Sequence, residues 1–202
     1  SSGKYRVGHS ALALVDSKTG RIFYFDFGRY HTPKGFGRVR DEQTDPDTKI
    51  TTKAKVVGFH ITNMKEILLE ISNNTSYRGE GKVYASIINK VNFYKAFYFA
   101  KKWQVKGLVP YGPFTINGTN CSRFVARVAR ASEISFVKKL RYMFPFCISP
   151  SPKRNISIGN KNYYTFKENI FKKIEKSSLK SYFSSIESEW SRGQKILTKK
   201  HN

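Results

Sequence analysis

Two β-rich runs near the N-terminus bracket a short turn, and this pattern constrains the fold more than any other part of the sequence. The runs cover residues 8–15 and 21–28, and the turn between them reads Asp-Ser-Lys-Thr-Gly. Aromatic, aliphatic and small residues that alternate on either side of a turn cluster are typical of a β-hairpin. We therefore expect the chain to begin with two antiparallel strands.

The register of this hairpin decides which polar side chains meet. If Asp16 lies opposite Arg21, strand alternation places Ala11 opposite Asp26, on the same face as His9. The other face then carries the leucines and phenylalanines of both strands. A shift of one residue would separate His9 from Asp26. In the first register, the small alanines leave room for a helix to approach the polar face, and we expect the helix that carries Cys121 to pack there.

Residues 118–128 form a second constraining stretch, which is typical of a helix start. Asn120 is a favoured N-cap residue, and apolar residues recur after it at helical spacing. Cys121 then falls in the first turn, where unpaired amides and the helix dipole favour a thiolate and can receive the charge of an oxyanion. The alternative is that Cys121 is a small buried apolar residue without a chemical role.

A cysteine nucleophile needs a base within hydrogen-bond reach, and the base needs a polar partner that fixes its orientation. His9 is the best candidate among the four histidines, because it shares a strand face with Asp26. Tyr24 is the fallback for the orienting role. The other histidines fit a core or rim position, a loop and the terminus: His60, His31 and His201.

Two segments, Gly8-His9-Ser10-Ala11-Leu12-Ala13-Leu14 before a hairpin and Asn120-Cys121-Ser122-Arg123-Phe124-Val125 at a helix start, carry a family resemblance. Their order resembles that of the circularly permuted papain-like cysteine hydrolases of the NlpC-type superfamily, with its lecithin:retinol acyltransferase-like and PPPDE-type proteins. The resemblance implies an α+β papain-like core, with a small antiparallel sheet packed against the Cys121 helix. It also implies hydrolysis or acyl transfer at an amide, isopeptide or ester bond of a cell-wall peptide, protein or lipid, without a cofactor. Relatives commonly carry a second histidine where this chain has Asp26.

The remaining pattern predicts a strand over 54–61 and helices over 64–71, 93–103 and 135–144. In the last of these helices we expect four residues to face inward: Phe136, Val137, Leu140 and Phe144. Residues 145–160 are rich in turn formers, which predicts a linker. Apolar spacing predicts two further helices, over 166–174 and 179–190. We therefore expect a hydrolase domain over 1–150 and a docked helical extension over 151–202.

A loop rich in glycine and charge follows the hairpin and is the expected place for substrate contacts. Its candidate binding residues are Arg29, Tyr30 and Arg38. The acidic group after it (Asp41, Glu42, Asp45 and Asp47) does not follow calcium-loop spacing, so we expect a solvated turn and no metal site.

The charge is extreme for a chain of this length. Thirty-seven Lys and Arg against 14 Asp and Glu give a formal charge of +23 over 202 residues, which predicts attraction to an anionic substrate or surface such as cell wall, lipid or acidic protein. Nucleic acid is an open partner, but no zinc, RRM or heptad motif supports it. The alternative function is a non-catalytic basic binding module for anionic membrane or nucleic acid. We expect a monomer.

The sequence does not determine the cellular compartment of the protein. The two cysteines, Cys121 and Cys147, allow at most one disulfide. No apolar run reaches membrane-spanning length and no signal peptide is visible. The chain does not begin with Met, which is compatible with a signal or anchor that has been removed, so bacterial cell envelope and cytoplasm both fit.

Overall fold

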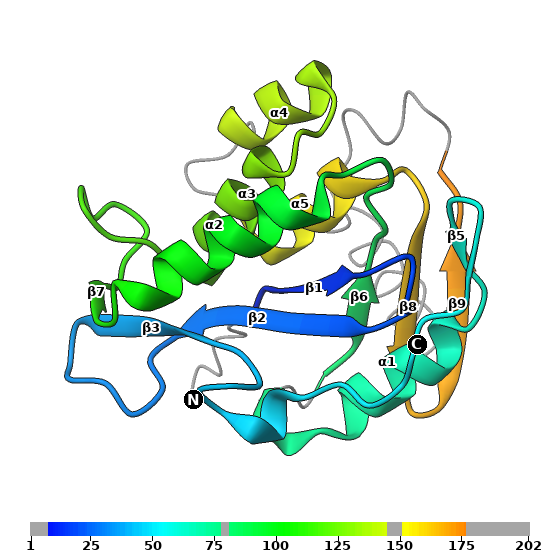
Figure 1. Cartoon of the computed structure of the whole chain (residues 1–202), viewed down its shortest axis with the longest axis horizontal. Coiled ribbons are helices and arrows are strands. Elements are labelled where there is room, and N and C mark those ends of the chain that lie inside the picture. The colour runs from blue at the N-terminus through cyan, green and yellow to red at the C-terminus, as the bar shows by residue number, and fades with distance from the viewer. Residues whose placement is uncertain (1–7, 78–80, 145–150, 177–202) are drawn as a thin grey trace, which may run out of the picture.

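The computed structural model describes residues 8–77, 81–144 and 151–176 (Figure 1). They form a mixed α+β fold with small antiparallel sheets and five α-helices. The main sheet has the order β1-β2-β3-β7. Its strands are β1 (Ala11–Val15), β2 (Ile22–Gly28), β3 (Phe36–Arg40) and β7 (Val109–Pro110). The helices are α1 (Met64–Asn73), α2 (Phe93–Val105), α3 (Cys121–Ala131), α4 (Phe136–Met143) and α5 (Pro152–Gly159).

The other strands form two smaller sheets. Strands β6 (Val83–Ala85), β8 (Tyr163–Lys167) and β9 (Ile170–Ile174) are arranged in the order β6-β8-β9. Strands β4 (Val56–Val57) and β5 (His60–Ile61) form a short hairpin where one longer strand over 54–61 was expected. Gly58, at φ 58°, provides the turn that splits it. Two 3₁₀ turns cover Pro46–Thr48 and Thr75–Tyr77.

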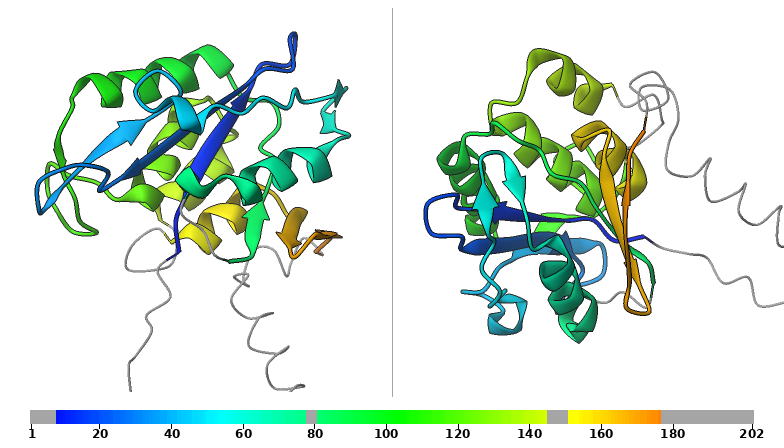
Figure 2. Two further views of the ribbon diagram at one scale, coloured as in Figure 1. Left: turned by 90° about the horizontal axis from the view of Figure 1, so that it is seen from below. Right: turned by 90° about the vertical axis from the view of Figure 1, so that its right-hand side faces the viewer.

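Helices cover both faces of the main sheet (Figure 2). On one face, Phe25 and Phe27 of β2 share a core cluster with Phe124 and Val128 of α3 and with the buried alanines of α2. On the other face, Tyr24 belongs to a second cluster that includes apolar residues of α1. Strand β2 is therefore buried on both faces, as its almost continuous apolar run requires.

The predicted hairpin register is confirmed. Ala11 pairs with Asp26, and the Asp16 amide donates to the Arg21 carbonyl at 2.9 Å. Gly20, at φ 73°, supplies the left-handed residue that closes the turn. This register places His9, two residues before β1, on the same side of the sheet as Asp26.

The expectation that the Cys121 helix packs on the alanine face is wrong. Phe124 and Val128 of α3 pack on the phenylalanine face instead, while Ala11 and Ala13 are exposed to solvent. The reason is the apolar area available for burial. A helix gains free energy in proportion to the apolar surface that it removes from water, and two alanines offer little of it.

The C-terminal part of the chain differs most from expectation. Residues 152–159 form helix α5 inside the segment predicted as a linker, and residues 163–174 form the β8–β9 hairpin where a helix was predicted. Glu168 and Asn169, both at positive φ, make a two-residue turn that a helix cannot contain. The predicted helix over 179–190 lies outside the described residues. The division at residue 150 stays a prediction, and β8 pairs with β6.

Helix α4 forms as predicted, but it does not bury the residues that its pattern selected. Phe136, Val137 and Phe144 are 72%, 56% and 64% exposed, and Leu140 is 38% exposed. The helix is held instead by Tyr142, which clusters with Ile158 of α5. A helical apolar pattern identifies which side of a helix is apolar, and another part of the fold decides whether that side is covered.

Candidate active site

Cys121 is the first residue of α3, at the edge of the main sheet. The Asn120 side chain caps this helix by accepting from the Arg123 amide at 2.8 Å, as predicted. The thiol is buried, with 8% of the residue exposed, and it is free. The disulfide that the cysteine count allowed is therefore not formed by Cys121; Cys147 lies outside the described residues.

Removing the cap is expected to loosen the thiol's surroundings. An Asn120→Ala variant loses the side-chain acceptor of the first turn and is expected to lose about 1 kcal/mol of unfolding free energy in urea. Asn92→Ala is the matched control, because Asn92 caps α2 in the same way by accepting from the Lys95 amide at 3.1 Å. Both variants should be destabilised, and only Asn120→Ala should change the alkylation rate of Cys121. Equal rates in the two variants would contradict this expectation.

The structure brings His9 between Asp26 and Cys121. His9 Nε2 lies 2.9 Å from Asp26 Oδ2, and the His9 side chain also hydrogen-bonds to Cys121. Since Nε2 is engaged by Asp26, Nδ1 is the ring nitrogen that is left for the thiol. Tyr24, the fallback candidate, donates its hydroxyl to Asp26 Oδ2 at 3.0 Å and is thus a second partner of the carboxylate.

Asp26 is a fully buried carboxylate that is surrounded by donors. Arg40 approaches with two nitrogens, Nε at 3.0 Å from Oδ1 and Nη2 at 2.8 Å from Oδ2, and Tyr30 donates to Oδ2 at 3.0 Å. Burial alone would raise the pKa of Asp26, but the hydrogen bonds from His9 and Arg40 lower it to about 2. Asp26 is therefore a permanent anion at neutral pH.

Arg40 is the main residue of the site that sequence reasoning missed. Its guanidinium lies 3.3 Å from the centroid of the Tyr30 ring, which adds a cation–π contact to the ion pair. The signal that could have found it is register: Arg40 of β3 lies directly opposite Asp26 of β2. Residues opposite each other in neighbouring strands are within side-chain reach.

The electrostatics favour an ion pair between the thiol and the imidazole. Burial lowers the pKa of His9, but hydrogen bonds to Asp26 and Cys121 outweigh it and raise the pKa to about 9. Burial likewise raises the pKa of the Cys121 thiol, but the His9 hydrogen bond and charge, together with the Ser10 amide, bring it below its ordinary value. Both shifts favour a thiolate beside an imidazolium over a neutral thiol beside a neutral imidazole.

Two further contacts lie around the thiol. Ser10 Oγ and Ser122 Oγ lie 3.2 Å apart and connect the start of β1 to the start of α3. Tyr111, which stacks on Phe27 with 5.7 Å between the ring centroids, hydrogen-bonds to Cys121 through its side chain. Sequence analysis assigned no role to either serine or to Tyr111, because their proximity to Cys121 depends on how the sheet and α3 meet.

The three predicted substrate contacts are in different environments. Arg29 is exposed, with its guanidinium 5.1 Å from the centroid of the Tyr111 ring. Tyr30 is buried and hydrogen-bonds to Asp26 and to His9, so it supports the site from within. Arg38 forms a two-fold ion pair with Asp45, both contacts at 2.7 Å. A substrate-binding role stays a prediction for all three.

The acidic group after β3 is not the solvated turn that was expected. Asp41 is buried and forms an ion pair with Lys101 of α2, and Asp45 pairs with Arg38. Glu42 also pairs with Arg21, so three of the four acids have basic partners. Among the described residues, no group of three or more His, Cys, Asp or Glu side chains is placed to hold a metal ion.

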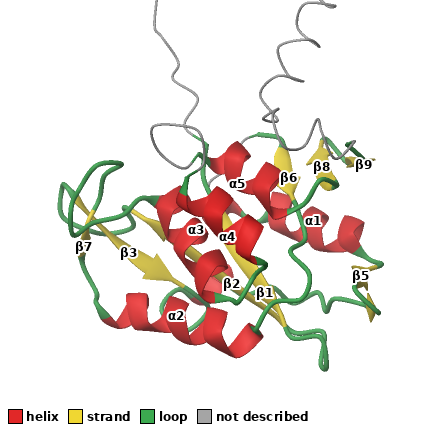
Figure 3. Ribbon diagram, turned by 90° about the horizontal axis from the view of Figure 1, so that it is seen from above, coloured by secondary structure: helices red, strands yellow, loops and turns green. Residues whose placement is uncertain are grey.

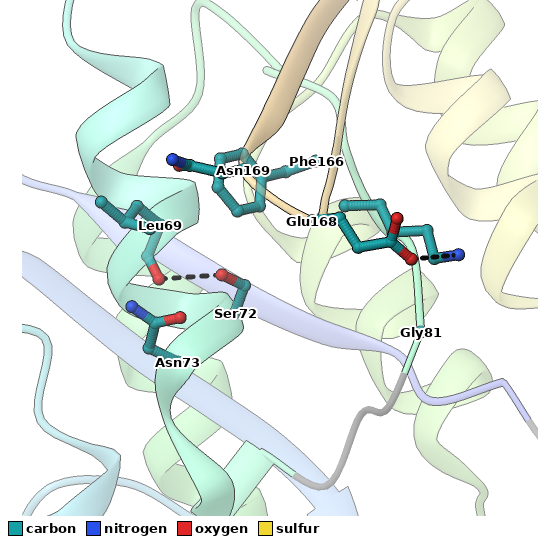
Figure 4. A pocket seen from close by; sticks show the side chains of 8 residues that line it. Leu69, Ser72, Asn73, Gly81, Phe166, Glu168 and Asn169 are labelled. Carbon is teal, nitrogen blue, oxygen red and sulfur yellow. Dashed lines mark hydrogen bonds and ion pairs between the residues drawn. The ribbon is translucent and has the colours of Figure 1, made fainter.

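A hollow of about 490 Å³ lies elsewhere, between α1 and the β8–β9 hairpin (Figure 4). Polar side chains around it have local partners: Ser72 donates to the Leu69 carbonyl, and Lys167 pairs with Glu168. The residues that line it are Leu69, Ser72, Asn73, Gly81, Phe166, Lys167, Glu168 and Asn169. None of them belongs to the Cys121 cluster, so the candidate catalytic residues lie around Cys121 and not at this hollow.

Comparison with known proteins identifies the family. A family model described as type VI secretion system effector TseH-like matches residues 1–136, about two thirds of the chain. The chain belongs to this TseH-like family. The crystal structure of the type VI secretion system effector TseH aligns with a TM-score of 0.59 and 19% identity, over 86% of this chain and 91% of that one. This likeness shows a shared fold. No curated protein matches the chain.

This finding corrects the family resemblance drawn from the sequence. The matching model is that of the TseH-like effectors, so the assignment to the lecithin:retinol acyltransferase-like and PPPDE-type group is wrong. That assignment was based on two short segments, the strand around His9 and the helix start at Cys121. Such segments describe only the local arrangement of a histidine and a cysteine. Local arrangements of this kind recur in unrelated families and do not identify one of them.

Proposed function

We propose that this TseH-like protein is a cysteine hydrolase or acyltransferase that acts on an amide, isopeptide or ester carbonyl. The observation that carries the proposal is the line of contacts from Asp26 through His9 to Cys121. A buried carboxylate, an imidazole and a thiol of lowered pKa form the arrangement that activates a nucleophile. The proposal rests on this geometry alone and needs no place among the permuted papain-like enzymes.

In the proposed acylation step, the Cys121 thiolate attacks the substrate carbonyl carbon and its π electrons move onto oxygen. His9, held as an imidazolium by Asp26, then gives its proton to the leaving amine or alcohol as the C–N or C–O bond breaks. The product is a thioester on Cys121. Asp26 keeps its charge throughout, because its pKa is about 2, and stabilises the imidazolium.

Two donors are available for the charge that develops on the carbonyl oxygen. The backbone amides in the first turn of α3 have no helical partners, and the helix dipole points its positive end at the same place. The Tyr111 hydroxyl, which contacts Cys121, is the second donor, because burial together with the Cys121 charge raises its pKa and keeps it protonated. In the last step, neutral His9 takes a proton from water or another acceptor, which attacks the thioester and releases Cys121.

The substrate proposed is an acyl group carried by a cell-wall peptide, a protein or a lipid. The formal charge of +23 suits an anionic substrate or surface. Arg29 is the candidate for contact with it, because its guanidinium is exposed beside Tyr111.

The pH dependence of Cys121 alkylation by iodoacetamide tests the proposal. Because only the thiolate reacts and His9 lowers the pKa of Cys121, the wild-type rate at pH 6 should exceed that of His9→Ala by about tenfold or more. The wild-type rate should change again near pH 9, where the imidazolium loses its proton.

The Cys121→Ala variant is the control for the alkylation assay, because it reports the reaction of Cys147 alone. Its rate is subtracted from the rates of the other two proteins. Equal Cys121 rates in wild type and His9→Ala across pH 5–9 would show that no ion pair exists. The hydrolase proposal would then fall.

A further inference from the structure

One end of the molecule carries exposed apolar side chains on a basic background. Figure 1 and Figure 3 both show the C-terminal end of α2, strand β7 and the loop after it at this end. Pairing of Phe36 with Pro110 adds the start of β3. We call the five exposed apolar residues here the apolar tip: Phe36, Val105, Leu108, Phe114 and Ile116.

The loop that carries the outermost part of the apolar tip is firmly held at its base. Tyr111 and Thr119 form a parallel bridge that joins the two ends of the loop. Arg123 Nη1 donates to the carbonyls of Gly112, Pro113 and Thr115 at 3.0–3.3 Å. The loop is therefore ordered by its backbone contacts and not by burial of its apolar side chains.

Phe114 and Ile116 point away from the protein despite this anchoring. They are 70% and 94% exposed, and Val105 at the end of α2 is 87% exposed. Single exposed apolar residues are common on protein surfaces, but a group on one protruding end marks an interaction site. These side chains are hardly buried in the fold and add little to its stability. Contact with a partner would explain why they are apolar.

The charge around the apolar tip selects the kind of partner. Residues 81–132, which include α2, the loop and all of α3, contain no Asp or Glu but nine Lys and Arg. Residues 27–40 contain no acid and, besides the ion-paired Arg38 and Arg40, two more basic residues. Exposed basic residues beside the apolar tip are Arg29, Lys34, Lys102 and Lys106. Apolar side chains ringed by cations complement a surface that is anionic outside and apolar beneath, which is an anionic lipid bilayer.

We propose that the apolar tip docks this protein on an anionic membrane, with Phe114 and Ile116 entering the boundary between headgroups and acyl chains. None of the described helices is long and apolar enough to cross a bilayer, and docking of this kind requires no such helix. Cys121 follows the loop directly, so docking holds the thiol close to the lipid surface. The proposal is independent of whether Cys121 is catalytic.

Sedimentation with vesicles tests the docking. The wild-type protein should pellet with phosphatidylcholine vesicles that contain about one third phosphatidylglycerol, and far less with pure phosphatidylcholine vesicles. The Phe114→Ser/Ile116→Ser variant should bind the anionic vesicles about tenfold or more weakly, because two apolar side chains no longer leave water. Phe136→Ser/Val137→Ser is the matched control: this α4 pair is also exposed, at 72% and 56%, and its loss should leave binding unchanged.

Three results would overturn the proposal. The first is absence of the wild-type protein from the anionic pellet. The second is an equal effect of the two serine pairs, which would mean that charge alone attracts the protein. The third is unchanged vesicle binding in Phe114→Ser/Ile116→Ser together with slower ester hydrolysis, which would assign the apolar tip to substrate.

A fluorescence measurement tests the docking without relying on variants that lose binding. In Ile116→Trp, the emission of the added tryptophan, taken as the difference from wild type, should shift to shorter wavelength when anionic vesicles are added. Val57→Trp places the probe on the β4–β5 hairpin, at a residue that is 65% exposed and outside the apolar tip, and should show no shift. Equal shifts at the two positions would argue against docking through the apolar tip.

Discussion

Replacing Cys121 with alanine should abolish formation of an acyl-enzyme. Wild-type protein mixed with p-nitrophenyl acetate is expected to release a burst of about one equivalent of p-nitrophenol, because the Cys121 thiolate takes up the acetyl group. Without the sulfur, the carbonyl meets only His9 and the oxyanion donors. Losses on the order of 10⁴-fold or more are typical when a nucleophile of this kind is removed.

Mass spectrometry makes the result specific to the site. The peptide that contains Cys121 should gain the mass of one acetyl group in wild type, and less than a tenth of the molecules should do so in His9→Ala. Cys147→Ala is the control for the second thiol and should keep the full burst. A burst that survives in Cys121→Ala, or that disappears in Cys147→Ala, would mean that another residue is the nucleophile.

The parts of the site that sequence could predict are those set by local chemistry. The hairpin register follows from the turn at residues 16–20 and from alternation, and it fixed the pairing of Ala11 with Asp26. The helix start follows from Asn120, whose side chain caps α3 as expected. Both are decided within a few residues, so the order of the chain is enough to derive them.

The parts that sequence could not predict depend on which surfaces meet. Arg40 is one residue among 37 basic ones, and only the pairing of β2 with β3 places it on Asp26. The apolar side of α4 was visible in its spacing, but its exposure was not, because Tyr142 provides the contact instead. Residues 163–174 had helical apolar spacing, and the left-handed turn at Glu168 and Asn169 overrides it.

Breaking the buried ion pair behind the site has the largest expected effect on stability. The side chains of Arg40 and Asp26 are 6% and 0% exposed. An Arg40→Ala variant leaves the Asp26 carboxylate buried without its two strongest donors and should lower the unfolding free energy at pH 7 by about 3–5 kcal/mol. Urea unfolding measures this loss. Arg21→Ala is the matched control, because it breaks a surface pair with Glu42 and should cost below about 1 kcal/mol.

The sign of the pH dependence separates this cause from a simple packing loss. Asp26 has a folded-state pKa of about 2, below the ordinary value of 3.8, so it contributes stability that is present above pH 3.8 and lost as the pH falls through about 2. Without Arg40, the pKa of Asp26 should rise, and the carboxyl should take up a proton at a higher pH. The difference in stability between wild type and Arg40→Ala should therefore shrink on acidification. A difference that stays constant down to pH 3 would indicate lost packing alone.

A double-mutant cycle completes the argument. In Asp26→Asn/Arg40→Met no charge is left buried without a partner, so the double variant should be less destabilised than the sum of the two single variants. That result would show that each buried charge is tolerated because the other one neutralises it. The same double variant should lose the low-pH reactivity of Cys121, since an amide cannot hold His9 as an imidazolium. If the double variant regains stability but not the low-pH reactivity of Cys121, the ion pair orients His9 and keeps it protonated. If the reactivity of Cys121 is unchanged, the role of Asp26 is only structural.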